Sequence, residues 1–375
     1  MATAPAIVPT DVQQRLASLD ALRGFDMFWI TGGAALVEAI ARKADWPAFT
    51  RVAKFFCEHV DWEGFHFHDL IFPLFLFVIG AAMPFSLGRR LEQGATRRDL
   101  LLKVLRRTAL MFALGLVYYG WLEFKPITQM RALGVLQRLA LCYGIAGVVM
   151  LFLRVRGQAF VAAACLVAYY LLMRFVPVPG EHAGPWSMQG NLANYLDRLL
   201  FARGQIWEDY GDPEGLLSTI PAVATALLGV LAGQWLRTPR DGNVKTLGML
   251  AAGAMLIGAG HLWALDMPII KKLWTSSFVL VAGGWSLVLV SAFYWLIDVR
   301  GWTGWAFYFV VIGLNPITIY VGQEIINFDA IGEFFLRGVA SHLPGWKPIV
   351  LAAGGLAARW LFLLFLHRRR VYLRL

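Results

Sequence analysis

The sequence predicts an all-α fold, a polytopic membrane helix bundle of about ten transmembrane helices. The first observation is composition: the 375 residues are 58% hydrophobic and only 15% charged, whereas ordinary soluble domains carry about 25% charged residues. The second is that apolar segments of roughly 20 residues, the length needed to cross a bilayer as a helix, recur along the whole chain. The composition therefore excludes an ordinary soluble domain.

Ten segments are long and apolar enough to be expected as membrane helices. They are 21–40, 69–87, 104–122, 132–153, 158–176, 215–236, 246–265, 277–297, 304–321 and 348–366. The 37 glycines and 15 tryptophans fit this class, because glycine allows close helix approach and tryptophan favours the membrane interface. We find no sharp internal repeat, so residues 1–375 are expected to form a single transmembrane domain.

Basic residues follow every second apolar segment. These clusters lie at 89–107, 154–156, 237–245, 300 and 368–374. Because cytoplasmic loops of membrane proteins carry an excess of Lys and Arg, both termini are expected in the cytoplasm, including a tail at 1–18. The loops at 41–68, 177–214, 266–276 and 322–347 then face the opposite side.

Two of the outer segments are unusual. The loop at 177–214 is the longest, opens with V-P-V-P-G and is rich in carboxylates, so we expect a structured cap over the outer mouth of the bundle rather than a simple turn. The segment 324–343 mixes charged and apolar residues and is too polar to span comfortably. It predicts an interfacial or re-entrant helix.

Charge and cysteine usage narrow the function classes. The net charge is +10, but the basic residues form short clusters between apolar segments, which indicates membrane topology and not a nucleic-acid partner. Cys57, Cys142 and Cys165 are an odd number without C-x-x-C spacing, so neither a disulfide framework nor a zinc site is indicated. The lipid bilayer is the expected partner, and a homodimer stays open.

The junction at 59–80 places three histidines and three carboxylates directly before an apolar run. Ionisable groups are costly in hydrocarbon, so such a cluster at a helix mouth suggests a site. His59 could take a proton from an amine or hydroxyl while Asp69 orients its ring. The alternative, an outer-surface histidine with Asp69 capping the helix, has about equal weight on the residues alone.

His66 and His68 form an H-x-H pair beside Asp69. On an extended segment such a pair places both rings on one face, as metal ligation requires. Without a second spaced ligand group the signal is weak. We therefore expect solvated interfacial histidines and no metal.

Charged residues also occur in the first apolar segment. Asp20, Arg23 and Asp26 follow at intervals of three residues, so Asp20 and Arg23 can pair on one helix face. Asp26 lies deeper and would cost about 2.5–3.5 kcal/mol if it faced lipid. It is expected to face the bundle interior, in a polar helix–helix network or in contact with substrate.

Two further polar clusters lie within apolar segments. Gln137 and Arg138 belong to the fourth segment. The second cluster, at the end of the ninth segment, consists of Asn315, Tyr320, Gln323 and Glu324. Pro316 removes a backbone donor next to Asn315 and should break the helix there. Both clusters predict a polar chamber, which an enzyme and a transporter would need equally.

Seven ordered blocks of this chain resemble the heparan-alpha-glucosaminide N-acetyltransferase family of multipass, acetyl-CoA-dependent transferases, including its DUF5009-like bacterial relatives. The blocks are S-L-D-A-L-R-G at 18–24, H-x-x-W-x-G with D-L and F-P at 59–73, G-V-L-Q-R-L at 134–139, Y-L-D-R-L-L at 195–200, D-P-E-G-L-L with T-I at 212–220, K-x-L-W-x-S-S ending at Ser277, and G-L-N-P with Y-V-G-Q-E at 313–324. The resemblance extends over nearly the whole length and implies the transmembrane acyltransferase fold.

The resemblance implies that an acetyl group passes from acetyl-CoA to an amino sugar or related glycan on the extracytoplasmic side. The family's active-site histidine falls on His59 and its neighbouring aspartate on Asp69. Candidate contacts to substrate or donor are Arg23, Asp26, Trp62, Gln137, Arg138, Asn315, Tyr320 and Glu324. The implied location is the inner (plasma) membrane of a bacterium.

Two positions depart from the family pattern. An asparagine-tyrosine-glycine-rich stretch is replaced by Thr31-Gly32-Gly33, and a histidine is replaced by Gln323.

In the acyltransferase hypothesis His59, oriented by Asp69, deprotonates the acceptor or briefly carries the acetyl group. The rival hypothesis is a secondary transporter or flippase for a sugar or glycolipid, which would also use a broken helix and internal polar residues.

Overall fold

The computed structural model describes residues 16–180 and 183–373, and in this part of the chain the secondary structure is helical. The β-structure within these residues consists of two isolated bridges, Glu63 with Ile270 and Glu208 with Gly211. The predicted all-α fold is confirmed. Most of the expected tail at 1–18 lies outside the described residues.

Eight helices in the described part of the chain are long and apolar enough to cross a membrane. They are Ala17–Ala44, Phe67–Glu92, Val135–Phe152, Val155–Phe175, Thr219–Leu236, Gly242–Trp263, Ser276–Val299 and Pro344–Arg368. A ninth span arises if the two helices Ala306–Gly313 and Pro316–Ile325, bent by 72° at the break between them, count as one. The molecule is a multi-pass membrane protein.

One of the ten expected spans differs. The segment 104–122 falls in α6 (Arg97–Tyr118), which is 22 residues long but carries Lys103, Arg106 and Arg107 in its amino-terminal half. These three charges keep α6 outside the class of apolar spans because Lys and Arg are costly at the bilayer centre. The estimate of about ten transmembrane helices is thus one higher than the structure supports by length and composition.

Backbone contacts divide the chain into two compact units. Unit 1 comprises the chain up to Cys57, Arg240–Gly248 and the part from Leu289 onward, and unit 2 comprises Glu58–Pro239 and Met249–Val288. Each is described by itself below. The single-domain organisation expected from the sequence stays a prediction.

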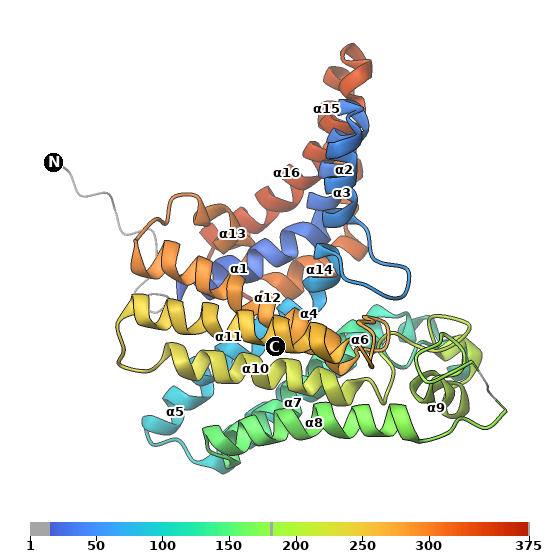
Figure 1. Ribbon diagram of the computed structural model, residues 1–375. Coiled ribbons are helices and arrows are strands. Elements are labelled where there is room, and N and C mark those ends of the chain that lie inside the picture. The colour runs from blue at the N-terminus through green and yellow to red at the C-terminus, as the bar shows by residue number, and fades with distance from the viewer. Residues whose placement is uncertain (1–15, 181–182, 374–375) are drawn as a thin grey trace. The chain divides into compact units, whose positions relative to one another are not determined.

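Unit 1 is built from two helix pairs and a broken first helix. Its helices are α1 (Ala17–Phe28), α2 (Ala34–Ala44), α3 (Pro47–Cys57), α13 (Ala306–Gly313), α14 (Pro316–Ile325), α15 (Phe328–His342) and α16 (Lys347–Arg368). The chain between α1 and α2 leaves helical geometry at Thr31 and Gly32, where the sequence departs from the family pattern. The main contacts pair α1 with α13 and α15 with α16. Figure 1 shows α15 and α16 side by side.

Unit 2 contains the helices that carry the His59 region. They are α4 (Phe67–Met83), α5 (Arg89–Glu92), α6, α7 (Val135–Phe152), α8 (Val155–Phe175), α9 (Leu192–Leu200) and α10 (Thr219–Leu236), with most of α11 (Gly242–Trp263) and the first part of α12 (Ser276–Tyr294). Helix α10 packs against α4, α7 and α8. A Cβ on Gly80 of α4 would clash with the carbonyl of Ala226 on α10. Glycine therefore lets these two backbones touch, as in many membrane helix pairs.

The long outer loop is structured in its described part, as expected. It contains α9 and a short 3-10 turn at Arg203–Gln205. Asn191 starts α9 by accepting a hydrogen bond from the Asn194 backbone N–H at 2.8 Å, a normal helix N-cap.

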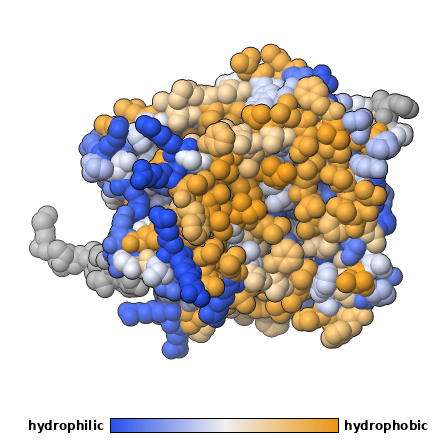
Figure 2. Space-filling model, turned by 90° about the horizontal axis from the view of Figure 1, so that it is seen from below, coloured by the Kyte–Doolittle hydropathy of each residue, from blue (hydrophilic) through white to orange (hydrophobic). Residues whose placement is uncertain are grey.

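The outward surface agrees with a membrane environment. Figure 2 shows a broad area of hydrophobic side chains on the face it draws. On α8, Phe160 is 74% exposed and Phe175 is 66% exposed. Exposed apolar area of this extent is unusual for a soluble protein and marks an interaction with lipid or protein. The expected location of α15 at the membrane interface stays a prediction.

Candidate active site

The loop that precedes α4 folds back onto the first turn of that helix and brings His59 to Asp69. The His59 Nδ1 atom lies 2.8 Å from Asp69 Oδ1. Asp69 Oδ2 accepts hydrogen bonds from the backbone N–H groups of His66 at 3.0 Å and Val60 at 3.3 Å. Asp69, three residues after the N-cap residue His66, thus accepts the His66 N–H and binds the histidine at once, and the catalytic role of the pair stays a prediction.

The exposure of the two side chains differs sharply. The Asp69 side chain is 1% exposed and the His59 side chain is 50% exposed. Because an ionised carboxylate oxygen only accepts, a hydrogen bond to Asp69 needs the ring hydrogen on Nδ1, and a neutral ring then carries its lone pair on Nε2. Asp69 thus holds one side of a half-exposed ring whose other nitrogen can accept a proton, an arrangement suited to general-base or nucleophilic catalysis.

A short backbone pairing joins this loop to the segment between α11 and α12. The Gly64 N–H donates to the carbonyl of Ile269 at 2.9 Å, and Glu63 forms a β-bridge with Ile270. Gly64 has φ +127°, a conformation that residues with a Cβ rarely adopt. This geometry explains why the H-x-x-W-x-G block ends in glycine.

Lys271 follows this pairing directly and reaches the candidate site. Its Nζ lies 2.9 Å from Nδ1 and 3.2 Å from Nε2 of His59, and 3.5 Å from Asp69 Oδ1. Burial lowers the pKa of Lys271, while the negative charges of Asp69 and Glu214 oppose that shift. The side chain is 23% exposed, so it lies at the edge of the site with access to water.

The other two histidines of the loop point to different partners. The His68 ring packs against the His59 ring with centroids 4.5 Å apart, while His66 Nδ1 lies 3.0 Å from the Glu58 carbonyl oxygen. In the described residues no three His, Cys, Asp or Glu side chains converge as a metal-binding set. The H-x-H pair does not present both rings to one ligand.

Trp62 connects the His59 loop to the long outer loop. Its indole N–H donates to the Trp186 carbonyl at 2.9 Å, and its ring meets Tyr210 edge-on at 5.9 Å between centroids. Lys272 Nζ donates to Tyr210 Oη at 2.9 Å and to Glu208 at 3.2 Å. Burial alone would lower the pKa of Lys272, but these two partners raise it overall.

A second charged group in unit 2 is centred on Arg131 and is called the Arg131 cluster, consisting of Arg131, Asp212 and Glu214. Arg131 makes a bidentate pair with Asp212, at 3.2 and 2.9 Å, and binds Glu214 at 2.6 Å. Its guanidinium lies 4.7 Å from the ring centroids of both Tyr119 and Trp207. Burial raises the pKa of Glu214.

Asp197 of α9 lies beside this cluster and is 1% exposed. It accepts hydrogen bonds from the backbone N–H groups of Leu216 at 3.1 Å and Asp212 at 3.3 Å. Burial raises the pKa of Asp197 to about 6, because desolvation outweighs these two hydrogen bonds. The carboxylate therefore holds the D-P-E-G-L-L segment against α9.

Gln137 and Arg138 lie on α7 and are both buried. Arg138 donates to the Gly215 carbonyl at 3.0 Å and to Ser218 Oγ, and its guanidinium lies 5.0 Å from the Trp274 ring centroid. Its Nε and Nη1 atoms and both polar atoms of Gln137 have no hydrogen-bond partner among the described residues. The structure places Arg138 against the D-P-E-G-L-L segment that follows the Arg131 cluster.

The remaining candidates lie in unit 1. Arg23 pairs with Asp20 at 3.0 Å, as the spacing predicts. Asp26 is fully buried, as expected, and its carboxylate oxygens have no hydrogen-bond partner among the described residues.

The helix break at Asn315 and Pro316 is present as predicted. Asn315 is buried, and its amide nitrogen donates to the Val371 carbonyl at 3.1 Å while its oxygen accepts from the Leu373 N–H at 3.1 Å. Both polar ends of this amide therefore hold the carboxy-terminal segment. On α14, Tyr320 is half-buried and Glu324 is exposed.

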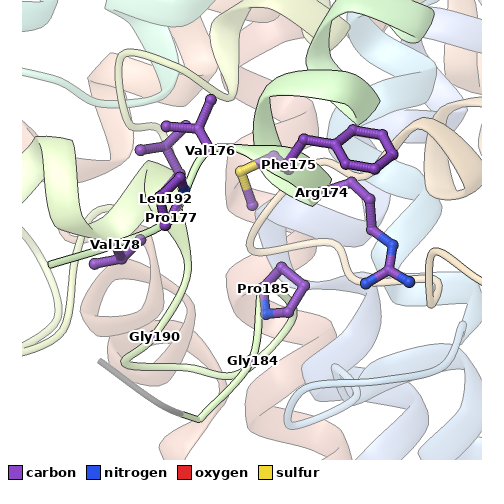
Figure 3. A pocket seen from close by; sticks show the side chains of 10 residues that line it. Arg174, Phe175, Val176, Pro177, Val178, Gly184, Pro185, Gly190 and Leu192 are labelled. Carbon is purple, nitrogen blue, oxygen red and sulfur yellow. The ribbon is translucent and has the colours of Figure 1, made fainter. Parts of the chain in front are cut away.

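A cavity of about 270 Å³ lies where the long outer loop passes the end of α8. Figure 3 shows Arg174 and Phe175 from α8 and Pro177, Pro185 and Leu192 from the loop around it. Its lining includes none of the candidate site residues. The cavity therefore does not by itself locate a substrate beside His59.

Comparison with known proteins agrees with this geometry. Residues 15–153, which include His59 and Asp69, match the family described as "Domain of unknown function (DUF5009)". Heparan-alpha-glucosaminide N-acetyltransferase from Mus musculus is 27% identical over 343 residues, covering 76% of this chain and 52% of that protein. The family resemblance is confirmed. The protein of the same name from Homo sapiens is 26% identical over 374 residues, covering 84% of this chain and 55% of its own length.

The chain thus spans about half the length of the curated relatives it matches. The sequence predicted that His59 and Asp69 meet, and their catalytic role stays a prediction; it assigned no role to Lys271 or Arg131. Lys271 begins the K-x-L-W-x-S-S block, which served only to identify the family, and it lies 212 positions from His59. The D-P-E-G-L-L block likewise contains Asp212 and Glu214, so both blocks pointed to residues whose contacts only the fold reveals.

Proposed function

We propose that this protein is a membrane acyltransferase that moves an acetyl group from acetyl-CoA to the amino group of an amino sugar or related glycan on the extracytoplasmic side. The observation that carries the proposal is the His59–Asp69 pair, 2.8 Å apart, with the ring half-exposed and the carboxylate buried. The names of the two relatives support acetyl transfer as the reaction class.

The proposed reaction uses His59 as the proton acceptor. The acceptor amine attacks the thioester carbonyl, the new N–C bond forms, the C–S bond breaks, and His59 Nε2 takes the amine proton. The imidazolium then returns this proton to the CoA thiolate, so the products are an amide and free CoA. In the two-step alternative, Nε2 attacks the thioester carbonyl and the C–S bond breaks, which releases the CoA thiolate. The amine then attacks the acetyl group, the bond between the acetyl carbon and Nε2 breaks, and the freed imidazole passes the amine proton to the thiolate.

The proposed orientation places His59 outside the cytoplasm. Basic clusters after every second apolar segment support cytoplasmic termini, and the loop at 41–68 then faces outward. In a bacterium this membrane would be the inner (plasma) membrane. Acetyl-CoA, made in the cytoplasm, would be engaged from within the bundle.

The deciding experiment measures transfer of labelled acetyl groups from acetyl-CoA to glucosamine and a panel of amino sugars by the purified protein. We expect His59→Ala to lower the rate by about 10²–10⁴-fold, the usual contribution of a positioned acid–base group, with acetyl-CoA binding retained. His342→Gln is the matched control, since His342 is an exposed histidine of α15 whose ring bonds the Gly338 carbonyl. Equal rates for both variants would refute a catalytic role for His59.

One observation favours the transporter as a second candidate. Helices α13 and α14 form a bent pair with a 72° break, and discontinuous helices line substrate sites in many secondary transporters. A transporter should move sugar across proteoliposomes without acetyl-CoA. Folded protein that fails to bind acetyl-CoA would place this candidate first.

A further inference from the structure

Lys271 occupies an unusual position for a lysine beside a general base. Its Nζ contacts both ring nitrogens of His59, at 2.9 and 3.2 Å, and approaches Asp69 at 3.5 Å. The backbone pairing of Gly64 with Ile269 and of Glu63 with Ile270 fixes this approach. The chain path therefore brings the backbone of Lys271 next to the His59 loop.

We propose that Lys271 is a positioning residue that keeps the His59 imidazole neutral and able to accept a proton. A carboxylate at hydrogen-bond distance favours the imidazolium, because opposite charges attract, whereas an ammonium at similar distance disfavours it. Asp69 alone would thus favour the protonated ring. With Lys271 present the two charges oppose each other and Nε2 stays available, so this inference rests on the proposed function of His59.

The charges around the site support this balance. His59 faces Asp69 from α4, Lys271 from the segment before α12, and the ring of His68. Lys271 in turn faces Asp69, Glu214 and its neighbour Lys272. The two carboxylates help retain the ammonium against the cost of burial.

Lys272 provides a matched control in the next position. Its ammonium binds Glu208 and Tyr210, and the structure gives it no described contact with His59. Replacing either lysine removes one positive charge from the same turn. A general change in surface potential would affect both variants alike, whereas the proposed effect is specific to Lys271.

The test follows the protonation of His59 directly, using diethyl pyrocarbonate on the full-length protein in detergent. This reagent modifies neutral imidazole, so the modification rate at His59, resolved by peptide mass spectrometry, reports at each pH how much of the ring is neutral. For Lys271→Met we expect the midpoint to rise by about one pH unit or more. Lys271→Arg and Lys272→Met should leave the midpoint near that of the wild type.

The same variants separate this inference from the proposed function. In the transfer assay the acidic limb of the rate profile should move upward with the His59 midpoint for Lys271→Met. Transfer with an unchanged midpoint would overturn the role of Lys271 and leave the acyltransferase proposal standing. A shifted midpoint without acetyl transfer to any acceptor would support the role of Lys271 and overturn the acyltransferase proposal.

Folding of each variant is checked by thermal unfolding. Lys271→Gln, which keeps a polar group at the partly buried position, replaces the methionine variant if that one does not fold. If Lys271→Gln has the same midpoint of His59 modification as the wild type while His59 still reacts, the proposal is overturned. An arginine variant that shifts the midpoint as far as the neutral variants does so as well, because the charge is then not the cause.

Discussion

The Arg131 cluster and the candidate site each bring a cation to a buried carboxylate, but they differ in what they leave accessible. In the Arg131 cluster the exposed fractions are 12% for Arg131, 0% for Asp212 and 13% for Glu214, and the guanidinium is held by two carboxylates and two aromatic rings. At the candidate site Asp69 is equally buried, but His59 is 50% exposed. The first arrangement fixes a loop, whereas the second fixes a ring that stays half-exposed beside Lys271.

This difference implies that stability and activity depend on different residues. A charge whose partners are all inside the protein contributes to the fold. A half-exposed base contributes little to the fold and most to the chemistry. Three substitutions test this separation.

Replacing Asp212 by Ala should have the largest effect on folding. The substitution leaves Arg131 without its bidentate partner in a buried site, and loss of one partner of a buried pair costs about 3–5 kcal/mol. We expect a matching fall in the free energy of unfolding in detergent, measured by denaturant titration. Asp209→Ala, which removes the exposed partner of Arg203, should cost about 1 kcal/mol or less. Similar losses for both variants would contradict a structural role specific to the cluster.

The pH dependence of stability should reveal Asp197 next. Burial raises its pKa to about 6 in the folded state, so the folded form binds the proton more tightly than the unfolded chain, whose Asp titrates near 4. Its contribution to stability is therefore present at low pH and is lost as pH rises from about 4 to 6, by about 3 kcal/mol in total.

The measurement compares wild type with Asp197→Asn, because other groups titrate in the same range. The free energy of unfolding of wild type minus that of the variant should fall as pH rises from 4.5 to 7. Asp209→Asn, at an exposed site, should give a difference that stays constant with pH. A constant difference for Asp197→Asn would show that this carboxylate is not desolvated.

The smallest effect on stability is expected for His59→Gln. Ion pairs with an exposed member contribute about 0–1 kcal/mol, and Asp69 keeps Lys271 and two backbone donors as partners. The free energy of unfolding should change by about 1 kcal/mol or less while acetyl transfer is lost. If His59→Gln loses much stability as well as activity, His59 contributes to the fold as the Arg131 cluster does, which would contradict the separation.

The sequence predicted those features that depend on local patterns. Runs of apolar residues located eight spans and the bent pair, the proline after Asn315 located the break, and the residue types before the second span located His59 and Asp69. In each case the relevant residues are neighbours in the chain, or ten positions apart for the histidine and the aspartate. Local burial and helix capping leave a direct trace in the sequence.

Other features depend on tertiary packing and left no such trace. Lys271 meets His59 across 212 positions, and Arg131 meets Asp212 across 81. The residue type of Asn315 suggested that it lines a polar chamber. In the structure its amide binds the backbone of the carboxy-terminal segment near Val371 instead. The apolar half of α6 suggested a span because the charges at its start were assigned to the preceding loop.

The backbone pairing of Gly64 with Ile269 couples the motion of the loop that carries His59 to that of the segment that carries Lys271. A fluctuation that moves one of these segments must break that hydrogen bond or carry the other segment along. Hydrogen–deuterium exchange at the Gly64 amide therefore reports how often the two segments separate and Lys271 moves away from His59. If an acceptor binds at His59 without raising the exchange rate of this amide, the two segments stay paired while it binds.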